Sequence, residues 1–268
     1  MLQLVPALLC VALAAPLAQS PLTAGVSEGV VAPAPAAPAP EEIAPVPEVE
    51  HTGVRTLLRD LKGDIKNLPS TTNLYFALGG GALALGVHPF DVTVNERLIN
   101  HYDTVNTIFA AGKYYGDTPE QAALSFGAYA MGRLFDMPRV AHLGMDLLRA
   151  QAITEMLVEP LKFAVGRPRP DGSNNQSFPS GHAAITFAAA AVIERHLGWK
   201  RSLLAYAIAG YVSASRLHDN RHYLSDVVFG AAVGQIAGRT VTLHGREHWA
   251  LGPSVVNRGV AMVASRIP

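Results

Sequence analysis

The fold and the chemistry of this chain depend on a stretch in its last quarter, Ser215–Asp226, which reads SRLHDNRHYLSD. Two other polar segments precede it, Lys162–Pro170 (KFAVGRPRP) and Pro179–His182 (PSGH), in a part of the chain that is otherwise apolar and rich in alanine. An unpaired charge in apolar surroundings is very costly, so the cationic side chains of these segments need an anionic partner. The sequence therefore predicts that the three segments meet at one anion-binding site, and we expect the anion to be a phosphate group.

Apolar residues at helical spacing predict a domain built of helices. Such spacing is clear between residues 54 and 65, and further helices are expected over residues 118–135, 139–166, 182–196, 200–216 and 222–240. Thr118 is expected to cap the helix in which Pro119 is the first residue. There is no alternation of strands and helices, which favours an all-α fold, a helical bundle. Valine-rich runs around Asn257–Gly259 predict a short C-terminal β-hairpin.

The chain divides into four regions by composition. Residues 1–20 are apolar, end in small residues and are typical of a signal peptide, which predicts a secreted or periplasmic protein. Residues 21–50 are rich in proline and alanine and are interpreted as a disordered linker. The helical domain is expected over residues 51–243, with a C-terminal tail over 244–268. The one cysteine, Cys10, lies in the first region, so the mature domain is expected to use neither disulfides nor thiol chemistry.

Charge and hydropathy narrow the class of partner. The net charge is zero, whereas binding to a nucleic-acid backbone needs a basic face, so nucleic acid is not expected as a partner. The glycine-rich apolar segment Leu74–Val87 is shorter than the roughly twenty residues of a membrane span. We interpret it as a close-packed helix and favour a soluble domain, with membrane association as the alternative. The sequence does not indicate an oligomeric state.

The first two polar segments each have a functional and a purely structural interpretation. Lys162 and Arg169 are seven residues apart, about two helical turns, so both can point to one side of a helix end and bind phosphate oxygens. Ser180 and Gly181 precede a helix, where free N–H groups attract anions. The structural alternatives are a solvated basic helix end for the first pair and ordinary capping for the second.

The third segment holds the candidate nucleophile. His222 and Asp226 are four residues apart, which places them on one face of a helix, where the carboxylate can orient the imidazole and leave its second nitrogen free. The alternative is a structural His–Asp pair. A metal site at His218, His222 and Asp219 is disfavoured, because neither a zinc-protease pattern nor a cysteine ligand is present. We therefore predict no metal and no other cofactor at this site.

The three segments in this order resemble the signature of the type-2 phosphatidic acid phosphatase and vanadium haloperoxidase superfamily, in its phosphatase branch. The resemblance covers residues 162–226, with similar helices over about 120–240, and implies a helical bundle and a metal-independent phosphatase mechanism. It implies that His222 attacks phosphorus and forms a phosphohistidine, that Asp226 orients His222, and that His182 protonates the leaving group. It further implies a set of phosphate-binding residues: Lys162, Arg169, Ser180, Gly181 and Arg216.

The motifs leave the substrate open and allow several alternative functions. Ala183 follows the PSGH segment where many relatives, including soluble acid phosphatases, have threonine or serine, which leaves the substrate open between a small ester and a lipid phosphate. The alternatives are a vanadium-dependent haloperoxidase, a membrane-embedded phosphatase for lipid or prenyl diphosphates, and a noncatalytic scaffold. Haloperoxidases of the superfamily are generally much longer, and an assay with halide and peroxide in the presence of vanadate distinguishes them.

Overall fold

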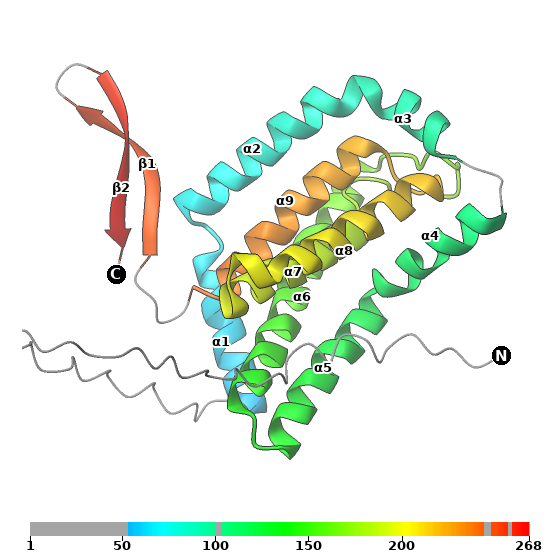
Figure 1. The fold of residues 1–268 in the computed structure, drawn as a ribbon. Helices are drawn as coiled ribbons and strands as arrows, with labels where there is room; N and C mark the ends of the chain where they lie inside the picture. Colours follow the sequence, from blue (N-terminus) through cyan, green and yellow to red (C-terminus); the bar gives the residue numbers. More distant parts are fainter. Residues whose placement is uncertain (1–52, 100–102, 244–247, 257–258, 268) are drawn as a thin grey trace, which may run out of the picture. The chain divides into compact units, whose positions relative to one another are not determined.

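The computed structural model describes residues 53–99, 103–243, 248–256 and 259–267, and their elements are labelled in Figure 1. The elements are α1 (Val54–Asn67), α2 (Thr71–Val87), the 3₁₀ helix η3 (His88–Phe90), α3 (Asp91–Leu98), α4 (Asp103–Tyr115), α5 (Thr118–Leu134), α6 (Pro138–Val165), α7 (Gly181–Leu197), α8 (Trp199–His218), α9 (Leu224–Val241), β1 (His248–Val256) and β2 (Gly259–Ile267). The predicted helical fold class is confirmed, and so is the hairpin, because β1 and β2 pair antiparallel. The predicted signal peptide and linker lie outside the described residues.

Helix α7 packs against α6, α8 and α9, and its alanine-rich sequence explains how it can do so. Its Ala188 and Val192 are fully buried in a cluster with Ile153 of α6 and Ala237 of α9. Burying one valine or isoleucine side chain contributes about 1.5–3 kcal/mol, and alanine allows helix axes to approach without a cavity. These contacts fix α6, α7 and α9 to one another.

Glycines on α9 bring its backbone against α7. A Cβ atom at Gly234 would lie 2.2 Å from the carbonyl oxygen of Ala184, and one at Gly230 would lie 2.5 Å from the carbonyl oxygen of Ser180. Both are far inside van der Waals contact, so only glycine permits this approach. The Gly230 contact lies one turn from Asp226, and it therefore sets the start of α9 against the start of α7.

Helix α2 is close-packed on one face only. A Cβ atom at Gly80 would lie 2.3 Å from the Cβ of Ala232 on α9, which confirms the predicted use of glycine for close approach. Away from this contact the helix exposes several leucine side chains: Leu74, Leu78, Leu83 and Leu85. The helical path continues through η3 into α3, so the expectation that this segment is too short and interrupted to span a membrane is wrong about its length. In the described part of the chain, Thr71–Leu98 is the stretch long and apolar enough for a span, and 17% of its apolar window is buried.

The start of α9 differs from the sequence-based expectation in a way that matters for the site. The helix begins at Leu224, with Tyr223 in extended conformation as its N-cap, so His222 lies in the preceding loop and does not share a helix face with Asp226. The side chain of Asp226 instead turns back to accept a hydrogen bond from the backbone N–H of Tyr223, at 2.8 Å. A carboxylate three residues into a helix forms such a capping bond because the first N–H groups have no partner within the helix.

The start of α5 also differs by one residue. The N-cap is Asp117, not Thr118, and its side chain makes no capping bond. Its carboxylate instead contacts the ring of His182, with Oδ1 2.9 Å from Nε2. The residue that the helix start would use as a cap is therefore directed to a candidate catalytic side chain.

The glycine contacts give a paired stability prediction. Gly234→Ala forces the new methyl group into the Ala184 carbonyl, and overpacking of this kind typically costs about 1–3 kcal/mol. Gly210→Ala on α8 is the matched control, because a Cβ atom there meets no atom within 4 Å. Alanine is better than glycine in a helix by about 1 kcal/mol, so the control should raise or leave unchanged the midpoint of thermal unfolding. Equal effects of the two substitutions on that midpoint would contradict the close α7–α9 contact.

Candidate active site

Several helix ends and two loops meet at one end of the bundle. The loop that follows α6 is bonded to the loop between α8 and α9 by the backbone N–H of Asp171, which donates to the carbonyl of Asn220 at 3.1 Å. The N–H of Ser180 donates to the carbonyl of Asp226 at 3.0 Å and ties the start of α7 to the start of α9. The three polar segments predicted from the sequence to meet are therefore brought together.

Two of the predicted phosphate-binding arginines form a group of mutually repelling cations with a third. Burial and the charge of Arg221 lower the pKa of Arg169. Burial also lowers the pKa of Arg216, against the opposing effect of Asp219, and Arg221 and Arg169 lower it further. Arg169 and Arg216 nevertheless remain charged at neutral pH, because the ordinary pKa of a guanidinium group lies far above 7. The buried Nε of Arg169 has no hydrogen-bond partner, so this group retains capacity to bind an anion.

Lys162 lies beside the start of α7. Its ammonium nitrogen would be 3.4 Å from a Cβ atom at Gly181, so glycine leaves space for it there. The same nitrogen contacts Glu159 one turn earlier on α6, at 2.6 Å from Oε1. Lys162 thus faces the expected site, but it is also paired with a carboxylate.

At the start of α7, Ser180 caps the helix and backbone N–H groups remain able to bind an anion. The buried hydroxyl of Ser180 accepts a long bond from the N–H of Ala183, at 3.5 Å, which is the capping role given as the structural alternative. Gly181 is the first residue of α7, so its N–H is among the groups that a helix cannot satisfy internally. The positive end of the α7 dipole therefore points to the same place as Lys162.

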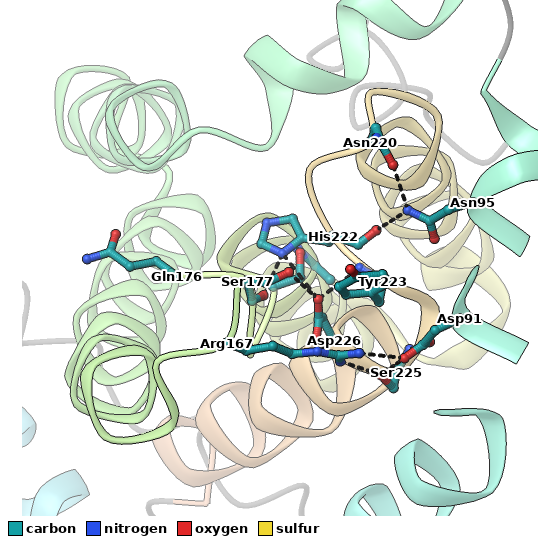
Figure 2. Close-up of polar contacts among 12 residues, drawn as sticks. Asp91, Asn95, Arg167, Gln176, Ser177, Asn220, His222, Tyr223, Ser225 and Asp226 are labelled. Carbon is teal, nitrogen blue, oxygen red and sulfur yellow. Dashed lines mark hydrogen bonds and ion pairs between the residues drawn. The ribbon is translucent and has the colours of Figure 1, made fainter. Parts of the chain in front are cut away.

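His222 is buried and held by backbone. Its Nδ1 donates to the carbonyl of Ser177 at 2.6 Å, as Figure 2 shows, whereas the nearest carboxylate oxygen of Asp226 is 3.9 Å away. The expected direct orientation of His222 by Asp226 is thus not observed, because the Asp226 carboxylate caps α9. A proton on Nδ1 leaves Nε2 with the ring lone pair. Burial first, and then the charge of Arg169, lower the pKa of His222 well below its usual value, so the ring is neutral.

Asp226 acts on His222 through Ser177 and is itself held by Arg167, a residue the sequence analysis missed. The hydroxyl of Ser177 donates to Asp226 Oδ2 at 2.6 Å, and Nη1 of Arg167 donates to Oδ1 at 2.6 Å (Figure 2). The Arg167 guanidinium also lies over the ring of Tyr223, 4.2 Å from its centroid. The carboxylate thereby fixes both the loop that carries the Ser177 carbonyl and the cap that precedes α9.

Helix α3 supports the same loop from the other side, and this contribution was also missed. Asp91 accepts from Arg167 Nη2 at 2.8 Å and from the backbone N–H of Ser225 at 2.8 Å. The side-chain amide of Asn95 donates to the carbonyl of His222 at 3.1 Å. Both side chains are buried, so the backbone around His222 is fixed by residues more than 120 positions earlier in the sequence.

His182 faces the cations from the start of α7. Its Nε2 is 2.9 Å from Asp117 Oδ1 and 3.5 Å from Nη1 of Arg216. Its other polar contact is a hydrogen bond to the backbone of Lys113, at the end of α4. Burial and the charge of Arg216 lower the pKa of His182 to about 3, so the imidazole is neutral at neutral pH when no anion is bound.

The alternative metal site at His218, His222 and Asp219 is not formed by the described residues. His218 stacks on Phe109 with ring centroids 4.6 Å apart, and His222 is bonded to Ser177. In the described part of the chain, three metal-ligating side chains come together elsewhere, at His142, Asp146 and His196.

Comparison with known sequences agrees with this arrangement. Residues 143–249 match the PAP2 superfamily, a range that contains all eight predicted site residues. The chain contains a PAP2 superfamily domain. A lipid A 1-phosphatase of Porphyromonas gingivalis is 41% identical over 99 residues, which are 36% of this chain and 21% of that protein. Lipid phosphate phosphatase 2 of Arabidopsis thaliana is 26% identical over 142 residues, 37% of this chain and 49% of that protein. The matches thus span between about a fifth and a half of these two relatives.

A solved structure shows the same fold. The transmembrane PAP2-type phosphatidylglycerolphosphate phosphatase from Bacillus subtilis superposes with a TM-score of 0.53 and 21% sequence identity, over 63% of this chain and 93% of that one. This superposition confirms the predicted helical-bundle class, and the match of residues 143–249 confirms the superfamily predicted from the three polar segments.

The contacts of Arg167 predict that replacing it strongly lowers the stability of the protein. Arg167→Met leaves the buried carboxylates of Asp91 and Asp226 without their shared partner, which should lower the free energy of unfolding by about 3 kcal/mol. Arg167→Lys should restore only part of the loss, because an ammonium group cannot bridge two carboxylates as a planar guanidinium does. Arg201→Met, at an exposed position on α8, is the control in the same denaturant titration. A loss no larger than that of the control would show that the bridge is not formed.

The low pKa of His182 predicts a pH effect on stability. Its pKa is lower in the folded state, about 3, than the usual 6.5 of an unfolded chain, so unfolding takes up a proton below about pH 6.5. Between pH 7 and pH 5, in phosphate-free buffer, the wild-type protein should lose about 2 kcal/mol more unfolding free energy than His182→Asn, which cannot titrate. Parallel pH profiles of the two proteins would contradict the buried, neutral imidazole.

Proposed function

We propose that this chain is a phosphatase that hydrolyses a phosphate monoester of a lipid through a covalent phosphohistidine at His222. The observation that carries the proposal is the position of the neutral, buried imidazole of His222 close to the charge of Arg169, whose buried Nε has no hydrogen-bond partner. A phosphoryl group supplies the missing negative charge and an electrophile for the imidazole at the same time. The lipid A and lipid phosphate phosphatases among the relatives support the reaction class.

Binding of the phosphate depends on groups that already converge. Arg169 and Arg216 offer planar N–H pairs for phosphate oxygens, and Lys162 adds a point charge. The N–H of Gly181 at the start of α7 and the hydroxyl of Ser180 complete the set. These groups stabilise the charge on the equatorial oxygens in the transition state, where phosphoryl transfer gains most from electrostatics.

In the first chemical step the Nε2 lone pair of His222 attacks phosphorus. The bond to Ser177 holds the Nδ1 proton in place, and the positive charge that develops on the ring is stabilised through Ser177 by Asp226. The phosphorus–oxygen bond to the lipid breaks, and the departing oxygen takes a proton from Nε2 of His182. The bound phosphate dianion and Asp117 both favour the protonated form of His182, so substrate binding prepares the acid.

In the second step His182 reverses its role. Its neutral Nε2 takes a proton from water while the water oxygen attacks phosphorus, and the bond between phosphorus and His222 Nε2 breaks. Inorganic phosphate is released, and both histidines return to their starting states. Asp117 acts as a positioning residue in both steps, because it contacts the same nitrogen that moves the proton.

The lipid class of the proposed substrate is supported by exposed apolar side chains. Four leucines of α2 are exposed, and Thr71–Leu98 has the length of a membrane span. Other large apolar side chains are exposed on neighbouring helices, including Phe163 near the end of α6, one residue after Lys162. Such a surface is suited to contact with lipid, and we propose that a lipid headgroup reaches the phosphate-binding groups from it. We further propose export of the chain, which rests on the sequence of residues 1–20.

The nucleophile is tested by His222→Ala. Loss of the nucleophile should reduce turnover of a lipid phosphate by about 10⁴-fold or more. Wild-type protein mixed with ³²P-labelled substrate and quenched in alkali should carry label on His222, because phosphohistidine survives base. His218→Ala, four residues earlier and also buried, should retain the label. Full turnover by His222→Ala would contradict the proposal.

The acid role of His182 is tested by the leaving group. His182→Ala should reduce the hydrolysis of an alkyl phosphate by about 10²–10⁴-fold, the usual contribution of general acid–base catalysis. The loss should be much smaller for p-nitrophenyl phosphate, because its departing oxygen hardly needs a proton. Measured kcat values that fall equally for both esters would rule out proton donation by His182.

A further inference from the structure

A second group of ionisable side chains lies at the other end of α6 and α7. His142 and Asp146 are one turn apart near the start of α6, and His196 lies in the last turn of α7. Lys162 is 20 residues along α6 from His142, and His182 is 14 residues along α7 from His196. At 1.5 Å per helical residue these separations are about 30 and 21 Å, so the group is separate from the candidate active site.

The three side chains have the spacing of metal ligands. His196 Nε2 is 2.8 Å from Asp146 Oδ2, and His142 Nε2 is 3.7 Å from Asp146 Oδ1. One donor atom from each residue lies within 4.8 Å of the others, and the two imidazole rings are 5.2 Å apart between centroids. Ligands of tetrahedral zinc, bound at about 2.0–2.1 Å, lie about 3.3 Å from one another. The observed distances fall on both sides of this value, so small side-chain rotations suffice to bind an ion.

The surroundings hold the central carboxylate and leave one side open. Asp146 is buried, and Nη2 of Arg149 donates to its Oδ1 at 2.6 Å and to the carbonyl of Val241 at 2.8 Å. Outer contacts of this kind fix the orientation of a metal-ligating carboxylate. The side chain of His142 is half exposed, which provides a path for an ion from solvent and a position for a water ligand.

We propose that His142, Asp146 and His196 bind a divalent transition-metal ion of the zinc type, with the fourth position open to solvent. Two imidazoles and one carboxylate form a donor set that binds zinc well. Magnesium prefers oxygen ligands and is not expected to bind there. The ion replaces the hydrogen between His196 Nε2 and Asp146 Oδ2, and the imidazole keeps its proton on Nδ1. It fastens the start of α6 to the end of α7 and stabilises the bundle.

The competing explanation is a metal-free set of His–Asp contacts. Both explanations predict that loss of His196 destabilises the protein, because a hydrogen bond to a buried carboxylate is lost in either case. Only the metal-site explanation predicts that added metal stabilises the protein, so the change in stability on adding metal distinguishes the two.

The experiment uses the full chain, without a polyhistidine tag, after treatment with chelator. Thermal unfolding is followed with no metal, with Zn²⁺ and with Mg²⁺, for the wild type, His142→Ala, His196→Ala and the control His88→Ala. Zn²⁺ at a hundredfold excess over its dissociation constant should raise the unfolding midpoint of the wild type by about 5–10 °C. The control should show the same shift, and each ligand variant should lose most of it.

Cobalt gives an independent readout of the ligands. Co²⁺ bound by two imidazoles and a carboxylate in a tetrahedral site absorbs visible light with characteristic intensity, and the band should appear for the wild type and for His88→Ala only. Equal zinc shifts in the wild type and in His142→Ala/His196→Ala, or no shift in the wild type, would overturn the proposal. Neither measurement uses phosphatase activity, so its outcome is independent of the proposed function.

Discussion

The bridge made by Arg167 between Asp226 and Asp91 is the interaction on which the rest of the site depends. It joins the loop after α6, the start of α9 and the start of α3, three parts of the chain that are far apart in sequence. With the carboxylate of Asp226 fixed, Ser177 is fixed by its hydroxyl, and the Ser177 carbonyl then fixes the tautomer of His222. The cost of burying these charges is offset only when all of them are paired, so the loops cannot rearrange independently.

Much of this could be predicted from sequence, and the reasons for the failures are physical. Helical spacing predicted the bundle, and the three dense polar segments in apolar sequence predicted where they would converge. The predicted placement of His222 and Asp226 on one helix face was wrong. A spacing of four residues suggested it, but His222 precedes α9 and the carboxylate of Asp226 caps that helix. An acidic residue three positions after a helix start was the signal for this capping role.

The missed residues show the limits of local patterns. Arg167 stands in the RPRP segment beside Arg169, and nothing in the sequence separates the arginine that pairs with carboxylates from the one that keeps its buried Nε unpaired. Asp91 and Asn95 reach the site across more than 120 residues, from a segment in which no motif was identified. The contact of Asp117 with His182 was not predicted, because the pattern Thr118-Pro119 suggested only that a helix begins there. Tertiary contact decided each of these roles, and no pattern within a short window carries that information.

The central claim is that Arg169, Arg216 and His222 surround one oxyanion. The most direct test is an experimental structure of the protein with orthovanadate, an analogue of phosphate in its transition state. The account predicts vanadium at bonding distance from Nε2 of His222, with its equatorial oxygens on the two guanidinium groups and on the N–H of Gly181. An oxyanion held at another place, or vanadium bound with the His222 ring turned away from it, would contradict it.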